Sequence, residues 1–214
     1  MAKYHARKFY SLPMSVFYKL SSLTMNPCCM AKTVYVQARE TWLCTGCAFP
    51  KPNTEAVDVT LQNKKPDNTP LNLISGCGVG IARKDFLFSF GEELVRQHLY
   101  LGKVFGPDGR PMENWLTFVG RHRVIIRGSK NAAVRQCLQC GRNVYFGMGQ
   151  LYLYPQPPDG VSIFDVGWGV LVISSDLLAR INLNQWRKLD CTELPVLQVP
   201  NDGLADLRGM YPEQ

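Results

Sequence analysis

The sequence predicts an α+β domain built largely on antiparallel β-sheet, with two or more short helices and a zinc-ribbon-like pair of cysteine knuckles. Three observations predict this class: short β-type runs between turn residues, two segments with helical spacing, and two Cys-x-x-Cys pairs. The chain has 214 residues, of which 46% are hydrophobic and 19% charged, so it can bury an ample core. We therefore expect a single domain over residues 1–214, with 200–214 as a C-terminal tail.

The first hundred residues are expected to contain short strands and then one helix. The β-type runs are Lys8–Tyr10, Val34–Val36 and Val57–Leu61. A polar loop rich in Pro, Asn and Lys follows, from 62 to 70. Asp85 is a good N-cap residue, and Leu87, Phe90 and Leu94 follow it at helical spacing. These residues predict a helix that ends near Gly102.

From Lys103 onward the pattern favours strands. A turn signal, Gly106–Gly109, precedes the β-type runs, which are Trp115–Val119, Arg121–Arg127 and Leu151–Tyr154. Alternating apolar residues then predict a strand over 166–172, and β-type runs recur at 186–189 and 196–199. Between them, Ser175 can cap a short helix that buries Leu177, Leu178 and Ile181.

The cysteine pairs Cys44/Cys47 and Cys137/Cys140 carry the strongest chemical signal in the chain. A Cys-x-x-Cys turn points two thiolates at one ion, so two turns supply the four sulfurs of a tetrahedral zinc site. A closed shell of four sulfurs has no position for substrate, which predicts a structural Zn²⁺ and not a catalytic one. The knuckle region comprises residues 40–50 and 134–146.

Other interpretations of the pairs stay open. The segment between them is far longer than the roughly 15–20 residues of a compact zinc ribbon. In one alternative the four cysteines are buried thiols without metal, and in another, one of the pairs is a redox site. The second pair lies between two β-type runs and not in a strand-loop-helix unit, which disfavours the thioredoxin-like alternative.

Cysteine usage and hydropathy indicate a cytoplasmic protein. The other four cysteines include the adjacent Cys28 and Cys29, a poor start for a disulfide framework, so a reducing compartment is expected. Pro13 and Lys19 interrupt the N-terminal apolar stretches before a signal-peptide core can form. No apolar run approaches the roughly 18 residues of a membrane span, so no membrane partner is expected.

Charge is unevenly distributed along the chain. The formal net charge is +7, and residues 114–158 contain six Lys/Arg but no acid. Alternation within one strand places Arg121, Arg123 and Arg127 on the same face. This face is either an ordinary solvated surface or a binding surface for an anion or a partner.

Motifs of known catalytic sites are missing from the sequence. It contains three histidines and has no His-Glu-x-x-His, Gly-x-Ser-x-Gly or phosphate-loop motif. We therefore expect that the protein is not an enzyme, with no catalytic residues and no bound organic cofactor.

The order of motifs along the chain resembles the double-CxxCG immunity proteins of bacterial contact-delivered toxin systems. The resemblance spans most of residues 8–199. It depends on Trp42–Cys47, a central helix ending near Leu101–Gly102, Gly120–Ser129, Cys137–Gly141 and Val170–Ser174. The paired knuckles are its specific part. One position departs from the family pattern, because Ala48 stands where glycine is expected after Cys47, which affects the geometry of the first knuckle.

The resemblance implies a cytoplasmic antitoxin that binds the toxic domain of a cognate effector and occludes its active site. It also implies that Cys44, Cys47, Cys137 and Cys140 are metal ligands. An inhibitor of this kind presents aromatic and arginine anchors to its partner, and Trp115, Arg121, Arg123 and Arg127 are our candidates. The acidic segment from Asp190 to Glu213 is a competing contact surface.

Two alternatives from other classes remain. A nucleic-acid-binding zinc-ribbon protein would account for the pI of about 9.0 and for tyrosines near the second knuckle on which bases stack. Against it, Lys and Arg are not dense around the cysteines, so nucleic acid is the less favoured partner. An oxidoreductase would need a cysteine thiol with a depressed pKa and turnover of a disulfide substrate.

Overall fold

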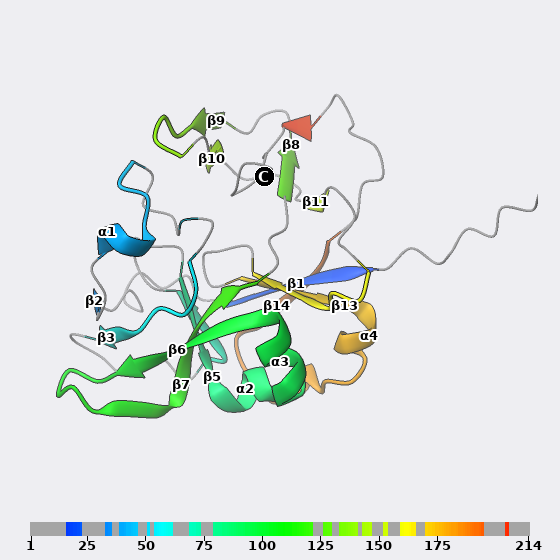
Figure 1. Ribbon diagram of the computed structural model, residues 1–214. Helices are drawn as coiled ribbons and strands as arrows, with labels where there is room; N and C mark the ends of the chain where they lie inside the picture. Colours follow the sequence, from blue (N-terminus) through cyan, green and yellow to red (C-terminus); the bar gives the residue numbers. More distant parts are fainter. Residues whose placement is uncertain are drawn as a thin grey trace, which may run out of the picture.

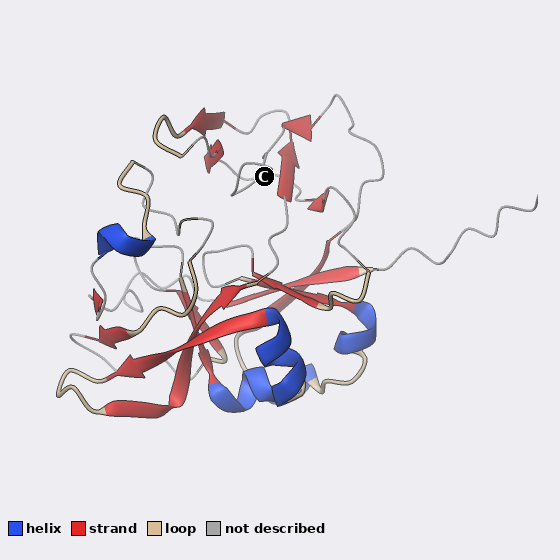
Figure 2. Ribbon diagram, in the orientation of Figure 1, coloured by secondary structure: helices blue, strands red, loops and turns tan. Residues whose placement is uncertain are grey.

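The structure of this chain is a computed structural model (Figure 1). It describes residues 16–22, 33–35, 39–46, 51, 54–61, 69–73, 79–121, 126–129, 133–140, 143–146, 152–153, 159–165, 170–194 and 204–205. Within these ranges it is an α+β fold of mostly antiparallel sheets with a few short helices, as the sequence predicts (Figure 2).

A six-stranded sheet in the order β2-β3-β6-β7-β5-β4 is the largest unit. Its strands are β2 (Thr33–Tyr35), β3 (Val59–Leu61), β4 (Leu71–Leu73), β5 (Gly80–Arg83), β6 (Leu99–Phe105) and β7 (Pro111–Gly120). All neighbours are antiparallel except β3 and β6. The long β6–β7 hairpin closes at the predicted turn, where the Gly109 N–H bonds the Gly106 carbonyl and Gly109 has a φ of 74°.

A four-stranded antiparallel sheet has the order β12-β13-β1-β14. Its strands are β1 (Phe17–Ser22), β12 (Ile163–Asp165), β13 (Leu171–Ser174) and β14 (Leu189–Leu194). Two smaller sheets complete the described strands. They contain β9 (Ala133–Gln136) with β10 (Asn143–Phe146), and β8 (Ile126–Ser129) between β11 (Tyr152–Leu153) and β15 (Leu204–Ala205).

Alternation along the central strands creates two cores on opposite faces of the six-stranded sheet. Leu116 and Phe118 of β7 face the first core, which also contains Leu20 of β1 and Leu171 of β13 and so joins the two large sheets. Val119 faces the second core, which includes Trp42 and Leu43 next to the first knuckle.

The predicted helix from Asp85 to near Gly102 is wrong in its extent. Two helices occur instead, α2 (Lys84–Phe88) and α3 (Glu92–His98), and β6 begins at Leu99. The break falls at Gly91, whose φ of 100° is not helical and is accessible because glycine has no Cβ. Asp85 lies inside α2 and not at its N-cap, which is Arg83.

Two further helices are short. The predicted helix near Ser175 is present as α4 (Ser175–Leu178), but its N-cap is one residue earlier, where the Ser174 hydroxyl accepts a bond from the Leu177 N–H. Leu177 is buried, as expected, and Leu178 and Ile181 are half-buried against the first core. The 3-10 helix η2 (Leu183–Gln185) follows, and α1 (Arg39–Trp42) precedes the first knuckle.

Strands outside the helical segments agree with the sequence at most described positions. The runs predicted at 34–36, 57–61, 115–119 and 151–154 correspond to β2, β3, β7 and β11. β1, a central strand of the four-stranded sheet, was not predicted. The predicted strand Lys8–Tyr10 and the run at 196–199 lie outside the described residues.

Candidate metal site

The first knuckle is attached to the second core of the large sheet. Trp42 and Leu43 are 6% and 3% exposed in that core, and Cys44 follows them directly. The Trp42 carbonyl accepts bonds from the Lys51 N–H (2.7 Å) and the Thr54 hydroxyl (3.0 Å), which hold the returning chain beside α1. Packing of Trp42 and Leu43 and the hydrogen bonds to the Trp42 carbonyl therefore position the segment that ends at Cys44.

The second knuckle is the turn of the β9–β10 hairpin. Gln136 at the end of β9 pairs with Asn143 at the start of β10, and Cys137 and Cys140 lie between them. This strand-knuckle-strand arrangement confirms the sequence interpretation. A two-stranded hairpin alone is marginally stable, so this knuckle benefits from a cross-link to a larger unit.

Three cysteines from the two knuckles meet in space. The Sγ atoms of Cys44, Cys137 and Cys140 all lie within 4.8 Å of one another, and those of Cys44 and Cys137 are 3.7 Å apart. Two sulfurs bound to one tetrahedral zinc at about 2.3 Å lie about 3.8 Å apart, whereas a disulfide requires about 2.05 Å. The spacing fits thiolates that share a metal and excludes a disulfide between these two residues.

Backbone groups in the second knuckle favour the thiolate form of Cys137. The Cys140 N–H is the main cause that lowers the pKa of the Cys137 thiol to about 6, and it outweighs burial, which raises it. The Gln139 N–H and the neighbouring thiols of Cys140 and Cys44 lower it further. Because Cys137 is only 7% exposed, hydrogen bonds from the protein, more than water, stabilise its thiolate form.

Residues between the cysteines also join the two knuckles, and sequence reasoning did not single them out. The Thr45 hydroxyl donates to the side-chain oxygen of Gln139, and that oxygen also lies 3.7 Å from the Cys44 Sγ. A Cβ on Gly46 would lie 2.9 Å from the Cys137 Sγ, closer than real contacts allow. The glycine inside the first Cys-x-x-Cys pair was the available signal, because close approach of two chains often requires glycine.

Three of the four predicted ligands are therefore together, and Cys47 lies outside the described residues. The donor set of sulfurs and the 3.7 Å spacing fit a soft metal ion such as Zn²⁺. Cys44 and Cys137 are buried and Cys140 is half-buried. This burial favours a structural metal site over a catalytic one that is open to substrate.

The four predicted partner-binding residues do not lie on one strand. β7 ends at Gly120, so Arg121 lies just outside the six-stranded sheet, whereas Arg127 belongs to β8 in the three-stranded sheet. The expected strand over 121–127 is therefore wrong at its start. Arg123 lies outside the described residues, and Arg127 pairs with Tyr152 through the backbone of β8.

Trp115 lies within β7, and Arg121 directly follows the last residue of that strand. Trp115 is half-buried and packs against the second core. Arg121 is exposed, its Nε donates to the Arg96 carbonyl at 3.1 Å, and its guanidinium lies 3.9 Å from the centre of the Tyr100 ring. These two contacts hold a cation in a defined position on the surface.

No family model matches this chain, and no curated protein does.

None of the helices in the described ranges is long and apolar enough to cross a membrane.

Proposed function

We propose that this protein is a non-catalytic immunity protein, stabilised by a structural zinc site, which binds a bacterial effector toxin domain and occludes its active site. The observation that carries the proposal is the convergence of two Cys-x-x-Cys segments, with the Sγ atoms of Cys44 and Cys137 3.7 Å apart. This convergence supports the paired knuckles on which the resemblance to the double-CxxCG family depends.

The arrangement of the knuckles supports a structural role for the metal. The first knuckle belongs to the second core of the six-stranded sheet, and the second is the tip of a separate two-stranded hairpin. Cys47 would complete a shell of four sulfurs with Cys44, Cys137 and Cys140. A bound zinc ion would supply a cross-link between distant chain segments, which contributes directly to folding stability.

The proposed partner surface includes Arg121 and its aromatic support. Arginine and aromatic residues dominate the energetics of many protein interfaces. The Arg121 guanidinium is already ordered by Tyr100 and by the Arg96 carbonyl, so less conformational entropy is lost when a partner binds. Leu138 at the tip of the second knuckle is 97% exposed and offers an apolar contact beside the metal site.

The test is capture of the partner with the tagged protein in its native host, followed by a high-salt wash and mass spectrometry. The expected result is one stoichiometric protein whose isolated domain is toxic in the cell and is neutralised by coexpression of this chain. Arg121→Ala should weaken retention, whereas Arg110→Ala, an exposed arginine at the β6–β7 turn, should not. Nucleic acid released in the salt wash, with no protein retained after it, would contradict the proposal, because phosphate contacts are salt-sensitive.

A further inference from the structure

The cysteine cluster combines close sulfurs with a position just below the surface. The Sγ atoms of Cys44, Cys137 and Cys140 lie within 4.8 Å of one another. Cys44 and Cys137 are buried, whereas Cys140 is half-buried. Leu138, which lies between the two cysteines of the second knuckle, is 97% exposed. Among these three cysteines, Cys140 is therefore the one that a small molecule from solvent, such as a peroxide, reaches first.

The two cysteines of the second knuckle differ from Cys44 in how they are held. Cys137 and Cys140 lie in one hairpin turn, between β9 and β10, which form a two-stranded sheet of their own (Figure 1). Cys44 directly follows Trp42 and Leu43 of the second core. A bond between Cys137 and Cys140 requires movement within a single turn, whereas a bond to Cys44 requires movement of two chain segments. Cys-x-x-Cys turns are well suited to such internal disulfides.

A contact that does not involve sulfur also joins the knuckles, but it is weak. The Thr45 hydroxyl donates to the side-chain oxygen of Gln139, and both residues are exposed. One neutral hydrogen bond at the surface adds little net stability, because water competes for both partners. A two-stranded hairpin is also marginally stable by itself. Withdrawal of Cys137 and Cys140 from the cluster therefore weakens the attachment of the β9–β10 hairpin to the first knuckle.

We propose that the second knuckle is a site of reversible oxidation, at which a peroxide joins Cys137 and Cys140 in a disulfide. Two of the sulfurs that would hold the metal ion are used in this bond, so the ion and the hairpin are released from the first knuckle. This oxidation site rests on the structural metal site of the proposed function. Cysteines that bind a metal do so as thiolates, and the thiolate is the form that reacts with peroxides.

The reaction balances with hydrogen peroxide as the oxidant. The Cys140 thiolate attacks one peroxide oxygen, the O–O bond breaks and hydroxide leaves, so that Cys140 becomes a sulfenic acid. The Cys137 thiolate then attacks the Cys140 sulfur, the S–S bond forms, and the S–O bond breaks with loss of a second hydroxide. Two electrons pass from the two sulfurs to the peroxide, and two protons from solvent convert the hydroxides to water. A dithiol reductant reverses the oxidation by thiol–disulfide exchange.

The test treats zinc-loaded protein with hydrogen peroxide while a chromogenic chelator reports free zinc. Samples are then alkylated with N-ethylmaleimide, digested without reductant and mapped by mass spectrometry. We expect about one zinc ion released for each disulfide formed between Cys137 and Cys140. Dithiothreitol followed by added zinc should restore the metal-bound protein. Cys191, which is exposed and outside the cluster, is the internal reference and should still be alkylated when this disulfide has formed. Cys191→Ser should release zinc at the rate of the unmodified protein.

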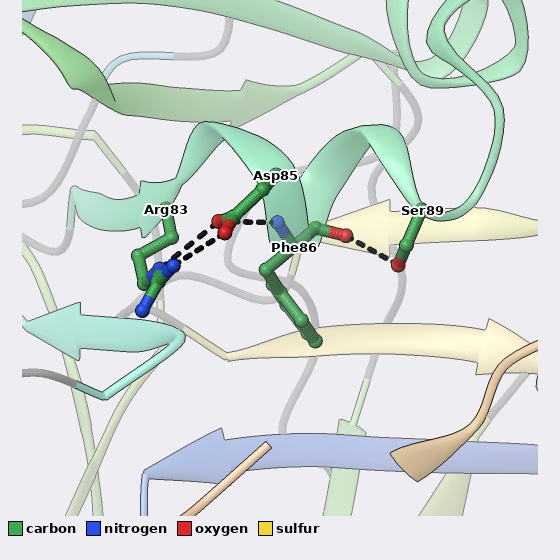
Figure 3. A network of polar contacts seen from close by, with 4 residues as sticks. All are labelled: Arg83, Asp85, Phe86 and Ser89. Carbon is green, nitrogen blue, oxygen red and sulfur yellow. Dashed lines mark hydrogen bonds and ion pairs between the residues drawn. The ribbon is translucent and has the colours of Figure 1, made fainter. Parts of the chain in front are cut away.

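Hydrogen exchange locates the structural effect of the oxidation. The amides of β9 and β10 should exchange faster by about tenfold or more in the oxidised protein. Helix α2 is the reference, because it packs against the first core and its own contacts hold its polar groups. The Arg83 guanidinium pairs with Asp85, and the Asp85 carboxylate accepts the Phe86 N–H at 2.9 Å. The Ser89 hydroxyl donates to the Phe86 carbonyl, as Figure 3 shows. Exchange in α2 should therefore stay unchanged.

Zinc content before oxidation separates this site from the proposed function. Protein that binds no zinc refutes the structural metal site, and the disulfide map then decides by itself whether the second knuckle is oxidised. Three results would overturn the oxidation site. They are alkylated Cys137 and Cys140 after a peroxide dose that oxidises Cys191, a disulfide that includes Cys44 instead, and zinc that stays bound after the disulfide has formed. Equal increases of exchange in α2 and in the β9–β10 hairpin would overturn the local release of the hairpin.

Discussion

The Sγ atoms of Cys44 and Cys137 lie 3.7 Å apart although the residues are 93 positions apart in the chain. This distance is close to the separation of about 3.8 Å between two sulfurs on one tetrahedral zinc. Cys44 directly follows Trp42 and Leu43 of the second core, and Cys137 lies in the turn of the β9–β10 hairpin. Closing so long a loop costs conformational entropy, and a metal ion bound by both cysteines would offset that cost.

The cross-link predicts that loss of the second knuckle destabilises the protein. Cys137→Ser with Cys140→Ser should lower the free energy of unfolding by several kcal/mol when zinc is present, because metal binding is linked to folding. Urea denaturation with and without a chelator measures the effect. Cys191→Ser is the control, since Cys191 is exposed and outside the cluster. A double variant as stable as the unmodified protein would rule out a structural metal.

The thiol of Cys137 predicts a pH dependence in the metal-free protein. Its pKa falls from 9.0 to about 6 in the folded state, so the folded protein binds fewer protons than the unfolded chain between these values. The Cys137 thiolate therefore contributes to the free energy of unfolding in full above pH 9. This contribution is lost as the pH falls towards 6, with a slope of at most about 1.4 kcal/mol per pH unit.

Urea unfolding at several pH values between 6 and 9, with a chelator present, checks this. Cys137→Ser should show a smaller rise of stability with pH than the unmodified protein. Equal slopes in the two proteins would contradict the assignment of a thiolate to Cys137.

Gly46 predicts a steric requirement inside the first knuckle. In Gly46→Ala the new methyl group would lie 2.9 Å from the Cys137 Sγ, so the knuckles must separate. Metal affinity should fall by about tenfold or more, as for other changes that displace ligands. A competition titration with a chromogenic zinc chelator measures it. Gly160→Ala, where a Cβ meets nothing within 4 Å, should retain the original affinity.

Gly102 predicts a similar requirement in the core. A Cβ on Gly102 would lie 2.7 Å from the backbone carbonyl carbon of Val57, and backbone cannot rotate away as a side chain can. The Thr117 hydroxyl bonds the same Val57 carbonyl, so the clash also disturbs a buried hydrogen bond. Gly102→Ala should cost about 2 kcal/mol or more, within the range for overpacked cores.

Thermal unfolding compares this variant with Gly109→Ala. Gly109 has a φ of 74° but open space around it, so its substitution reports only backbone strain, about 1–2 kcal/mol. Equal stability of the two variants would show that β6 can move away from Val57.

The sequence predicted those features that depend on local pattern. The β-type run at 115–119 identified β7, and Gly106–Gly109 identified the turn before it, although most of β6 was taken for the end of a helix. Cys-x-x-Cys spacing identified three of the residues that meet at the knuckles. The division of the helix at Gly91 was missed, because helical spacing continues across a residue whose φ of 100° breaks the helix.

Features that depend on tertiary contacts could not be predicted from local sequence patterns. β1 contains lysine and serines among its apolar residues, and its central place depends on pairing with β13 and β14, strands more than 140 residues away. The Arg121–Tyr100 contact arises because β6 and β7 pair in register, with Tyr100 opposite Val119. Neither relationship has a local signature.

Metal content of the purified protein tests the central claim most directly. Inductively coupled plasma mass spectrometry of the protein expressed with zinc should give one zinc per chain, and the Cys137→Ser, Cys140→Ser variant should give none. The Cys191→Ser variant should retain the full complement. A metal-free unmodified protein, or zinc that remains in the double variant, would contradict a zinc site built from the two knuckles.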